Sequence, residues 1–361
     1  MGQLEGLLCK IQQQSFCFLT GNATTGLFVA LKSLRLRNKN IAIPNSVCPH
    51  VPLAILLSGN NPIYLDITID NLGINIAHLR SCINQIDAVI AVHAYGYVCN
   101  ISEIAALCKS ESLPLIEDIA VAQGATHNSL PVGSFSDISV MSFGSGKIIN
   151  VGHGGAILTS NPVIFKRLCK YSSMLTNQTE YSRNIVNAFG QFHTDLYNKQ
   201  YGESINSYSA FFRSKALDAG VHMICAFDRS FESSIIKGLV ELKANLISRA
   251  EKAALIEATL KSSNLDGIKI FNAPAGSVYW RFNVSIDRRD ALLKKMLLAG
   301  IKVSSWFPSA DLFFKDDRPI ISDTPISDNV GDHILNIWVN EDASADYIKV
   351  VTEEIKKHAA Y

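Results

Sequence analysis

The sequence predicts an α/β protein built around a mainly parallel sheet, with a second, smaller α+β unit at the C-terminus. Strand-like runs alternate with helix-like stretches through the first 150 residues, a pattern typical of a layered α/β sheet. One run, residues 87–94 (DAVIAVHA), is apolar almost throughout, as expected for a strand buried on both faces. The chain of 361 residues, 48% of them hydrophobic, is long enough for two domains with separate cores.

The first half of the chain supplies the strands of the predicted sheet. A short strand ends at Leu19, and apolar residues at helical spacing predict a helix from Ala23 onward. The remaining expected elements, in chain order, are a strand at 41–43 stopped by Pro44, a helix at 51–58, strands at 62–66 and 87–94, a helix at 101–112, and strands at 113–117 and 138–140. Ligands of such sheets lie beyond the carboxyl ends of the strands, so the turns after these strands are candidate sites.

The second half of the chain is expected to link and form the smaller domain. Residues 232–261 carry apolar residues at helical spacing and predict one long helix between the domains, which we place at 1–245 and 246–361. Residues 279–360 indicate strand, helix, strand, loop, a strand at 334–339 and a closing helix.

Composition excludes several classes of protein. The net charge is +1 and no basic run is present, which argues against a nucleic-acid partner. No window of about 18 uninterrupted apolar residues indicates a membrane span, and the N-terminus lacks a signal layout, so we expect a cytoplasmic protein. The eight cysteines are scattered without a Cys-x-x-Cys pair, which predicts reduced core residues and no metal site.

The turn at residues 20–22 (Thr-Gly-Asn) opens the first predicted helix of the sheet. The free backbone N–H groups at the positive end of a helix dipole suit a phosphate group. Ordinary capping of the helix by Asn22 or Thr24 explains the same residues equally well. The turn by itself therefore leaves both interpretations open.

Two charged residues stand beside apolar runs. Asp118 closes the strand at 113–117, where a carboxylate needs a cationic or hydrogen-bonding partner; the alternative is a helix N-cap for residues 119–122. Lys147 lies in a glycine-rich turn within residues 137–156 (DISVMSFGSGKIINVGHGGA). A lysine held in a pocket can act as a nucleophile, although taken alone this one is better explained as a surface residue. Phosphate seat, carboxylate and lysine together are the parts that a pyridoxal 5'-phosphate site requires.

The order of these motifs resembles the DegT-type sugar aminotransferases, a branch of the aspartate-aminotransferase superfamily with pyridoxal-phosphate fold type I. The resemblance covers most of the chain. It is carried by GNATTGLFVAL at 21–31, IAIPNSVCPHVPLAILLSGNNPIYLDI at 41–67, VHAYGY at 92–97, IEDIAVAQGAT at 116–126, PVGSFSDISVMSFGSGK ending at Lys147, and YWRFNVSIDRRDALLKKMLLAGIKVSSWFPSADLF from 279.

The resemblance implies roles for individual residues. Lys147 matches the Schiff-base lysine and Asp118 the partner of the pyridinium nitrogen. Ser142, Ala23 and Thr24 match phosphate-binding positions. Further residues match the substrate side of the site: Arg229 lies in a motif that reaches the neighbouring subunit and implies a homodimer, and Trp306 occupies a C-terminal loop together with Phe307 and Pro308.

The chain also departs from the family pattern. Cys48, with His50 two residues on, stands where a residue usually stacks on the cofactor ring. Val121 replaces a glutamine that contacts the ring hydroxyl, and Gln123 is a candidate substitute. His153 replaces an acidic residue in a glycine-rich segment, and the asparagine that would reach the neighbour's phosphate is absent at 227–230.

The distance from Lys147 to Arg229 is about twice what the resemblance implies, because of an atypical insert at about 170–225. A lid, a substrate-recognition insert and added dimer surface are all open explanations for it. Loops of such length are usually functional or disordered.

The leading hypothesis is therefore a pyridoxal-phosphate aminotransferase that acts on small molecules. The resemblance implies glutamate as amino donor and a nucleotide-linked keto-deoxysugar as acceptor. The altered ring contacts favour, as an alternative, dehydration, decarboxylation or carbon–carbon bond chemistry on another metabolite. A non-catalytic regulatory protein on the same fold is a third hypothesis, which the intact lysine, aspartate and serine set disfavours.

Overall fold

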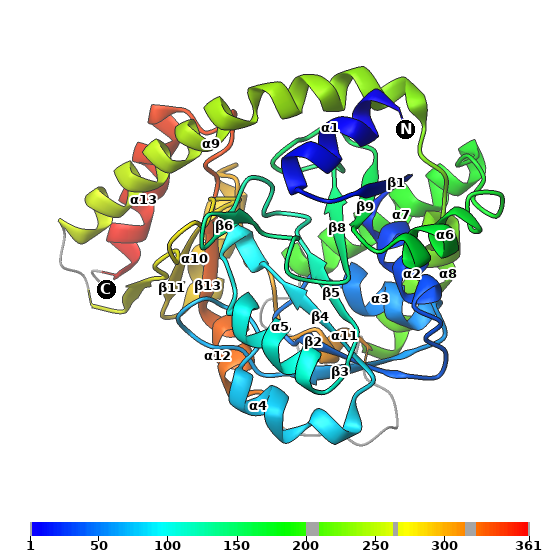
Figure 1. Cartoon of the computed structure of the whole chain (residues 1–361). Helices are drawn as coiled ribbons and strands as arrows, with labels where there is room; N and C mark the ends of the chain where they lie inside the picture. Colours follow the sequence, from blue (N-terminus) through cyan, green and yellow to red (C-terminus); the bar gives the residue numbers. More distant parts are fainter. Residues whose placement is uncertain (1, 200–208, 263–265, 315–322, 360–361) are drawn as a thin grey trace.

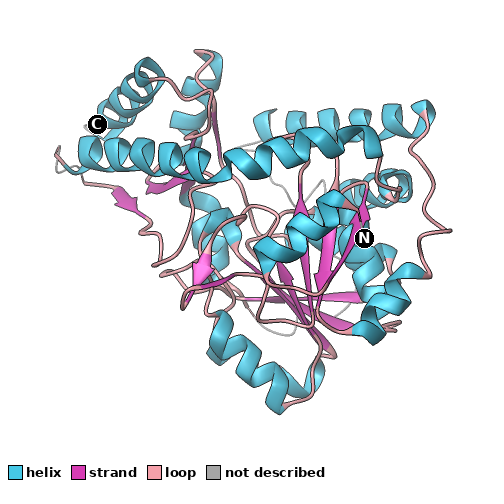
Figure 2. Ribbon diagram, turned by 45° about the horizontal axis from the view of Figure 1, so that its top comes forward, coloured by secondary structure: helices cyan, strands magenta, loops and turns pink. Residues whose placement is uncertain are grey.

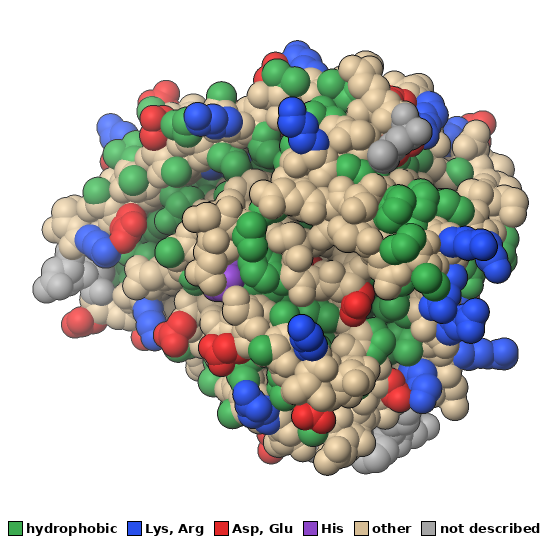
Figure 3. Space-filling view, in the orientation of Figure 1, with side chains coloured by type: hydrophobic (Ala, Val, Ile, Leu, Met, Phe, Trp, Pro, Cys, Tyr) green, Lys and Arg blue, Asp and Glu red, His purple; other side chains and the backbone are tan. Residues whose placement is uncertain are grey.

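The computed structural model describes residues 2–199, 209–262, 266–314 and 323–359 (Figure 1). A large sheet flanked by helices forms most of the molecule, and a smaller sheet with its own helices stands beside it (Figure 1). Within the described ranges, no helix has the length and apolar character needed to cross a membrane. On the face shown in Figure 3, acidic and basic side chains are interspersed, in keeping with the small net charge.

The large sheet has seven strands in the order β1-β9-β8-β5-β4-β2-β3. All pairings are parallel except those of β9, which runs antiparallel to both of its neighbours. The strands are β1 (Phe16–Thr20), β2 (Asn40–Pro44), β3 (Asn61–Leu65), β4 (Ala88–Val92), β5 (Leu115–Asp118), β8 (Ile138–Ser142) and β9 (Gly155–Thr159). The carboxyl ends of β1, β5 and β8 therefore meet at one edge.

Helices cover both faces of this sheet (Figure 2). Because successive side chains of a strand point to opposite faces, Ile41 and Ile43 join one apolar core, and Ala42 between them joins another. The helices that accompany the sheet are α1 (Gln3–Gln12), α2 (Ala23–Ser33), α3 (His50–Leu57), α4 (Ile76–Ser81), α5 (Ile101–Ser110) and α6 (Pro162–Cys169). Short elements between them are the 3-10 turns η1 (Ile83–Gln85) and η2 (Ala94–Gly96) and the hairpin of β6 (Thr126–His127) and β7 (Leu130–Pro131).

The insert expected at about 170–225 contains two helices that pack together, α7 (Glu180–Lys199) and α8 (Ser209–Met223). Helix α8 packs on α3 and on α11 (Asp311–Phe314), so the insert is joined to both parts of the chain. Residues 200–208 of the insert lie outside the described residues.

Helix α9 (Glu232–Lys261) follows the 3-10 turn η4 (Arg229–Phe231) and has the predicted bounds. Its first half packs Ile235, Leu239 and Leu242 into the core of the large sheet, and its last turns pack into the second core. The expected domain boundary at 245/246 falls between these two groups and stays a prediction.

A four-stranded antiparallel sheet, β10-β11-β13-β12, forms the smaller unit. Its strands are β10 (Ile268–Ile270), β11 (Phe282–Ile286), β12 (Val303–Ser304) and β13 (Ile334–Ile337), and its helices are α10 (Arg289–Leu298), α12 (Pro325–His333) and α13 (Ala345–Ala359). Helices α10 and α13 and the end of α9 cover this sheet with a shared apolar core.

These elements confirm the predicted α/β fold with a small C-terminal α+β unit. One alternative interpretation of the sequence, a helix capped by Asp118, was wrong. No helix follows Asp118; residues 119–124 form turns, and the Asp118 carboxylate accepts the Ala120 N–H within one of them. Between Lys147 and β9 the chain forms a glycine-rich turn, and β9 begins at Gly155.

Candidate active site

One cavity of about 1030 Å³ opens at the carboxyl edge of the large sheet. It brings together the turn before α2, the end of β5, the turn that carries Lys147, and the insert helix α7. Of the ten candidate residues from the sequence, seven line this cavity: Ala23, Thr24, Cys48, His50, Asp118, Ser142 and Lys147. The structure therefore brings most of the predicted set to one place.

The start of α2 forms one wall of the cavity. Asn22 caps the helix, and its side-chain oxygen accepts the Thr25 N–H at 2.8 Å. The capping explanation is thus correct, and the N–H groups of Ala23 and Thr24 stay at the free end of the helix, as in any first turn. Gly155 allows this approach, because a Cβ there would lie 2.6 Å from the Asn22 carbonyl carbon. The wall combines a capped helix with a seat for an anion.

Lys147 is half-buried, in a turn whose backbone accepts hydrogen bonds from side chains far away in the sequence. The indole Nε1–H of Trp280 donates to the Gly146 carbonyl at 2.7 Å, and the Asn245 side chain donates to the Ile148 carbonyl at 3.1 Å. Gly146 has φ +76°, a conformation that favours glycine. Side chains from α9 and from the segment before β11 therefore fix the lysine's backbone at the cavity wall.

Asp118 is 6% exposed at the end of β5. Burial raises the pKa of its carboxyl group, and the Ala120 N–H together with Lys147 and His93 only partly offsets this effect. A carboxylate in such a position gains from a cationic partner in the cavity. A protonated pyridine nitrogen would supply that positive charge.

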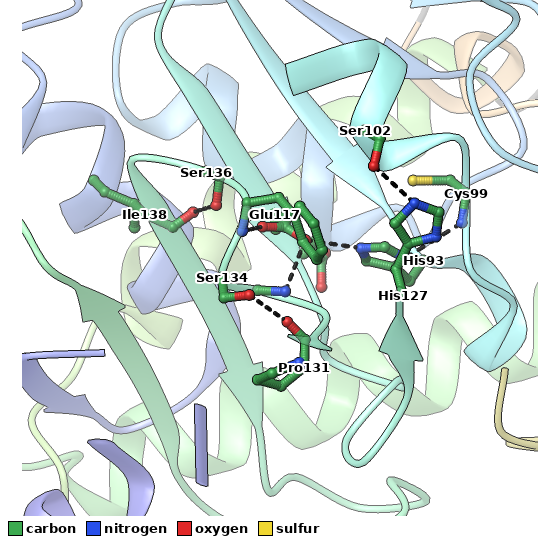
Figure 4. Close-up of polar contacts among 12 residues, drawn as sticks. His93, Cys99, Ser102, Glu117, His127, Pro131, Ser134, Ser136 and Ile138 are labelled. Carbon is green, nitrogen blue, oxygen red and sulfur yellow. Dashed lines mark hydrogen bonds and ion pairs between the residues drawn. The ribbon is translucent and has the colours of Figure 1, made fainter. Parts of the chain in front are cut away.

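Glu117, the residue before Asp118, is completely buried on the other face of the strand. Figure 4 shows Glu117 and His93 directed toward each other from β5 and the end of β4, at 3.2 Å between Oε1 and Nε2. The same carboxylate accepts the N–H groups of Gly133 at 2.7 Å and Phe135 at 2.9 Å. Burial lowers the pKa of His93, but neighbouring Cys99 and Glu117 outweigh it and raise the pKa to about 10. These bonds fix the strand end that carries the catalytic candidate Asp118.

Ser142 and Gln123 lie at different depths. Ser142 lines the cavity, and its Oγ accepts the Gly144 N–H at 3.4 Å. Gln123 is fully buried outside the lining and donates from Nε2 to the Ser142 carbonyl at 2.6 Å. Its Oε1 has no hydrogen-bond partner among the residues that the structure describes. The structure thus places Gln123 behind the end of β8, where it supports Ser142.

Cys48 and His50 lie beside the anion seat. His50 Nδ1 is 3.1 Å from the Thr24 hydroxyl oxygen. Burial and the nearby Lys147 lower the pKa of His50 to about 4, so this imidazole is neutral at pH 7. Burial raises the pKa of Cys48, which keeps its thiol protonated. Both side chains offer neutral groups to a ligand.

Arg229 and Trp306 lie apart from the cavity lining. The Arg229 guanidinium pairs with the carboxylates of Glu5 and Glu232. Trp306 stacks against Trp280 at 5.9 Å between ring centroids, within an aromatic group that includes Phe307. Their predicted roles toward substrate or a neighbouring subunit stay predictions.

The cavity also contains residues that sequence reasoning did not select as site residues. Asp228 lies at the cavity, and its backbone N–H donates to His153 Nε2 at 3.1 Å. His153 stacks on Phe231 at 4.8 Å, so the histidine that breaks the family pattern has an aromatic support. Helix α7 contributes Arg183, Val186, Asn187, Phe189, Gly190 and His193. The sequence signal that could have indicated this helix is the helical spacing of Ile185, Phe189 and Phe192.

No group of three or more His, Cys, Asp or Glu residues suited to a metal ion occurs in the described ranges. The side chains at the cavity fit pyridoxal phosphate instead. A helix start can bind its phosphate, a buried carboxylate can face its ring nitrogen, and a lysine lines the same cavity.

The chain belongs to the DegT/DnrJ/EryC1/StrS aminotransferase family, whose model matches residues 1–192. It is 29% identical over 187 residues to GDP-perosamine synthase of Escherichia coli O157:H7, covering 51% of each chain. It is 31% identical over 148 residues to GDP-perosamine synthase of Vibrio cholerae, covering 40% of each. The match therefore spans about half or less of these relatives' length.

Solved structures confirm the predicted fold. An aminotransferase of the same family from Brucella abortus has a TM-score of 0.78 at 18% identity, over 99% of this chain and 90% of that one. The aminotransferase TlmJ from Streptoalloteichus hindustanus has a TM-score of 0.79 at 19% identity, over 100% and 91%. Helicobacter pylori PseC, an aminotransferase involved in the biosynthesis of pseudoaminic acid, has a TM-score of 0.78 at 15% identity, over 99% of this chain and 90% of that one.

Proposed function

We propose that this protein is a pyridoxal-phosphate-dependent aminotransferase. The observation that carries the proposal is the convergence of Lys147, Asp118 and the start of α2 on one cavity, in a chain of an aminotransferase family. These groups come from three separate segments, and neither core packing nor helix capping requires that they meet.

The chain's own residues have distinct tasks in this proposal. When bound, pyridoxal phosphate supplies an aldehyde and an electron-accepting ring that stabilises negative charge at a substrate carbon. The Lys147 amine would hold the aldehyde carbon and, once released, move the proton between cofactor and substrate. Asp118 would keep the ring nitrogen protonated. The first turn of α2 and the Ser142 hydroxyl would bind the phosphate.

We infer glutamate as the amino donor and a nucleotide-linked keto-deoxysugar as the acceptor. Two relatives named GDP-perosamine synthase support a sugar nucleotide. The cavity of about 1030 Å³ supports a ligand larger than the cofactor, because pockets for drug-sized ligands start at about 300 Å³. The proposal also includes a homodimer in the cytoplasm. Exposed apolar side chains at Met174, Tyr181 and Val221 support an interface with a second copy.

An absorbance spectrum of the protein with added pyridoxal phosphate tests the proposal. We expect a visible band of the lysine-bound cofactor that disappears when glutamate is added. The band should be absent in Lys147→Ala and retained in the control Lys10→Ala, since Lys10 is exposed on α1.

The other outcomes decide between the remaining hypotheses. A band that glutamate and other amino donors leave unchanged would contradict transamination and favour dehydration, decarboxylation or carbon–carbon bond chemistry with the same cofactor. A wild-type protein that binds no cofactor would contradict both enzyme hypotheses and favour a regulatory role.

A further inference from the structure

Helix α7 lines the same cavity as the residues expected to hold the cofactor. Arg183, Asn187 and Gly190 lie at helical spacing on the side of α7 that lines the cavity. None of these residues packs into an apolar core: all three are exposed. A polar, accessible helix face that lines a cavity is available to a ligand.

The apolar side of α7 is anchored, so this wall is a built part of the fold. Phe189 is 8% exposed and packs on Phe212 of α8 at 5.6 Å between ring centroids. Phe212 in turn packs on Phe313 at 4.9 Å and on Phe314 at 5.6 Å, both from α11. An aromatic cluster therefore ties the insert to the C-terminal part of the chain and sets the position of the polar face.

Arg183 gives the outer cavity a positive charge. Among the described lining residues, the lysine and arginine side chains are Lys147 and Arg183, and the proposed function engages Lys147 with the cofactor. The Arg183 Nη1 donates to the Gln178 carbonyl at 2.9 Å, which orients the guanidinium and leaves further N–H donors. Asp228 lines the same cavity; hydrogen bonds from Ser230 lower the pKa of its carboxyl group, and His153 and Arg183 add to this effect.

Gly190 marks open space beside this charge. A Cβ built on Gly190 meets no atom of the described residues within 4 Å; Gly190 lines the cavity with a helical backbone, so a larger residue would occupy this open space without backbone strain. A glycine in the middle of a helix costs about 1 kcal/mol relative to alanine. The missing side chain leaves room about one turn from Asn187, which also lines the cavity.

We propose that α7 is the acceptor-binding wall of this enzyme. Arg183 binds a phosphate group of the acceptor, Asn187 donates a hydrogen bond to the phosphate-bearing part of the acceptor, and Gly190 leaves space for that part. The inference rests on the proposed function, and it assigns to the insert the recognition of an anionic, phosphate-bearing acceptor. Arginine suits this role because its planar fork matches two phosphate oxygens.

Calorimetric titration of the cofactor-loaded, full-length protein with GDP, UDP and dTDP tests the inference. We expect wild type to bind at least one of these, and Arg183→Ala to bind it about 10- to 100-fold more weakly, as for loss of a charged hydrogen bond. Arg183→Lys should lie between them. The matched control is Arg80→Ala, because Arg80 is an exposed helical arginine of α4 away from the cavity.

Gly190→Leu supplies an independent variant with a matched control. It should abolish or strongly weaken nucleotide binding by filling the space, while helix propensity favours its folding. Gly6→Leu is the control, since Gly6 is also helical and also meets no atom within 4 Å, but lies on α1 outside the cavity lining.

The outcomes separate this inference from the proposed function. Wild-type affinity in both Arg183→Ala and Gly190→Leu would overturn the inference, and so would a wild-type protein that binds none of the three nucleotides. Failure of the proposed function would instead be seen in the wild-type spectrum, as no response to glutamate, whatever the nucleotide titrations give.

Discussion

Replacing Asp118 with asparagine should have opposite effects on the apoprotein and on cofactor binding. The substitution removes a negative charge and keeps both the shape and the oxygen that accepts the Ala120 N–H. Because burial raises the folded-state pKa of Asp118, its ionised form destabilises the fold once the pH exceeds the unfolded value of 3.8. At pH 7 we therefore expect the Asp118→Asn apoprotein to melt at the wild-type temperature or above it.

Cofactor binding should weaken in the same variant. Loss of one partner from a buried ion pair costs about 3–5 kcal/mol, which corresponds to about 10²- to 10⁴-fold in affinity. Wild-type protein at a cofactor concentration 100 times its Kd should gain about 2.7 kcal/mol of stability, and Asp118→Asn almost none at that concentration. Thermal melts with and without pyridoxal phosphate measure both effects.

The control for this experiment is Asp137→Asn at the opposite edge of the sheet. The Asp137 carboxylate accepts the Leu115 N–H at 2.9 Å at the start of β5. This variant should bind the cofactor as wild type does. The reasoning is refuted if Asp118→Asn retains wild-type cofactor affinity, or if its apoprotein is clearly less stable than wild type.

Three further substitutions test the supports of the site. Glu117→Ala leaves three donors without their acceptor, two of them buried, and should cost about 3–5 kcal/mol, seen as a lower urea midpoint; an unchanged midpoint would contradict the buried network. Trp280→Phe removes the donor to the Gly146 carbonyl and should cost about 1 kcal/mol of stability. It should also slow the loss of the cofactor band on addition of glutamate, measured by stopped-flow absorbance. An unchanged rate would show that the turn of Lys147 does not need this hydrogen bond. Burial acts to raise the pKa of Glu5, but Arg229 outweighs this effect and lowers the pKa. Glu5→Gln should therefore lower the free energy of unfolding by about 0.5–1 kcal/mol. This loss should be complete above pH 4.5 and should shrink as the pH falls further. A stability difference between wild type and Glu5→Gln that grows as the pH falls would contradict this expectation.

The strands and the inner site were predictable because their signals are local. The continuous apolar run of β4 identifies a strand buried on both faces, and Asp118 and Lys147 follow such runs at the edge where ligands of α/β sheets usually bind. Neighbouring residues in the chain carry this information. Convergence of the strand ends then follows from the parallel sheet.

The remaining features depend on contacts between distant segments. The placement of β9 between β1 and β8 is a matter of long-range pairing that no local pattern specifies. The direction of the Gln123 side chain, toward the Ser142 carbonyl, depends on the turns after β5. Ile185, Phe189 and Phe192 have the spacing of a helix, but only packing against α8 shows that α7 faces the cavity.

Reductive trapping tests the central claim most directly. Wild-type protein is loaded with pyridoxal phosphate, reduced with borohydride, digested, and its peptides are identified by mass spectrometry. The account predicts a pyridoxyl group on Lys147, and none on that peptide when excess glutamate is added before reduction. Stoichiometric modification of another lysine, with Lys147 unmodified, would contradict the account.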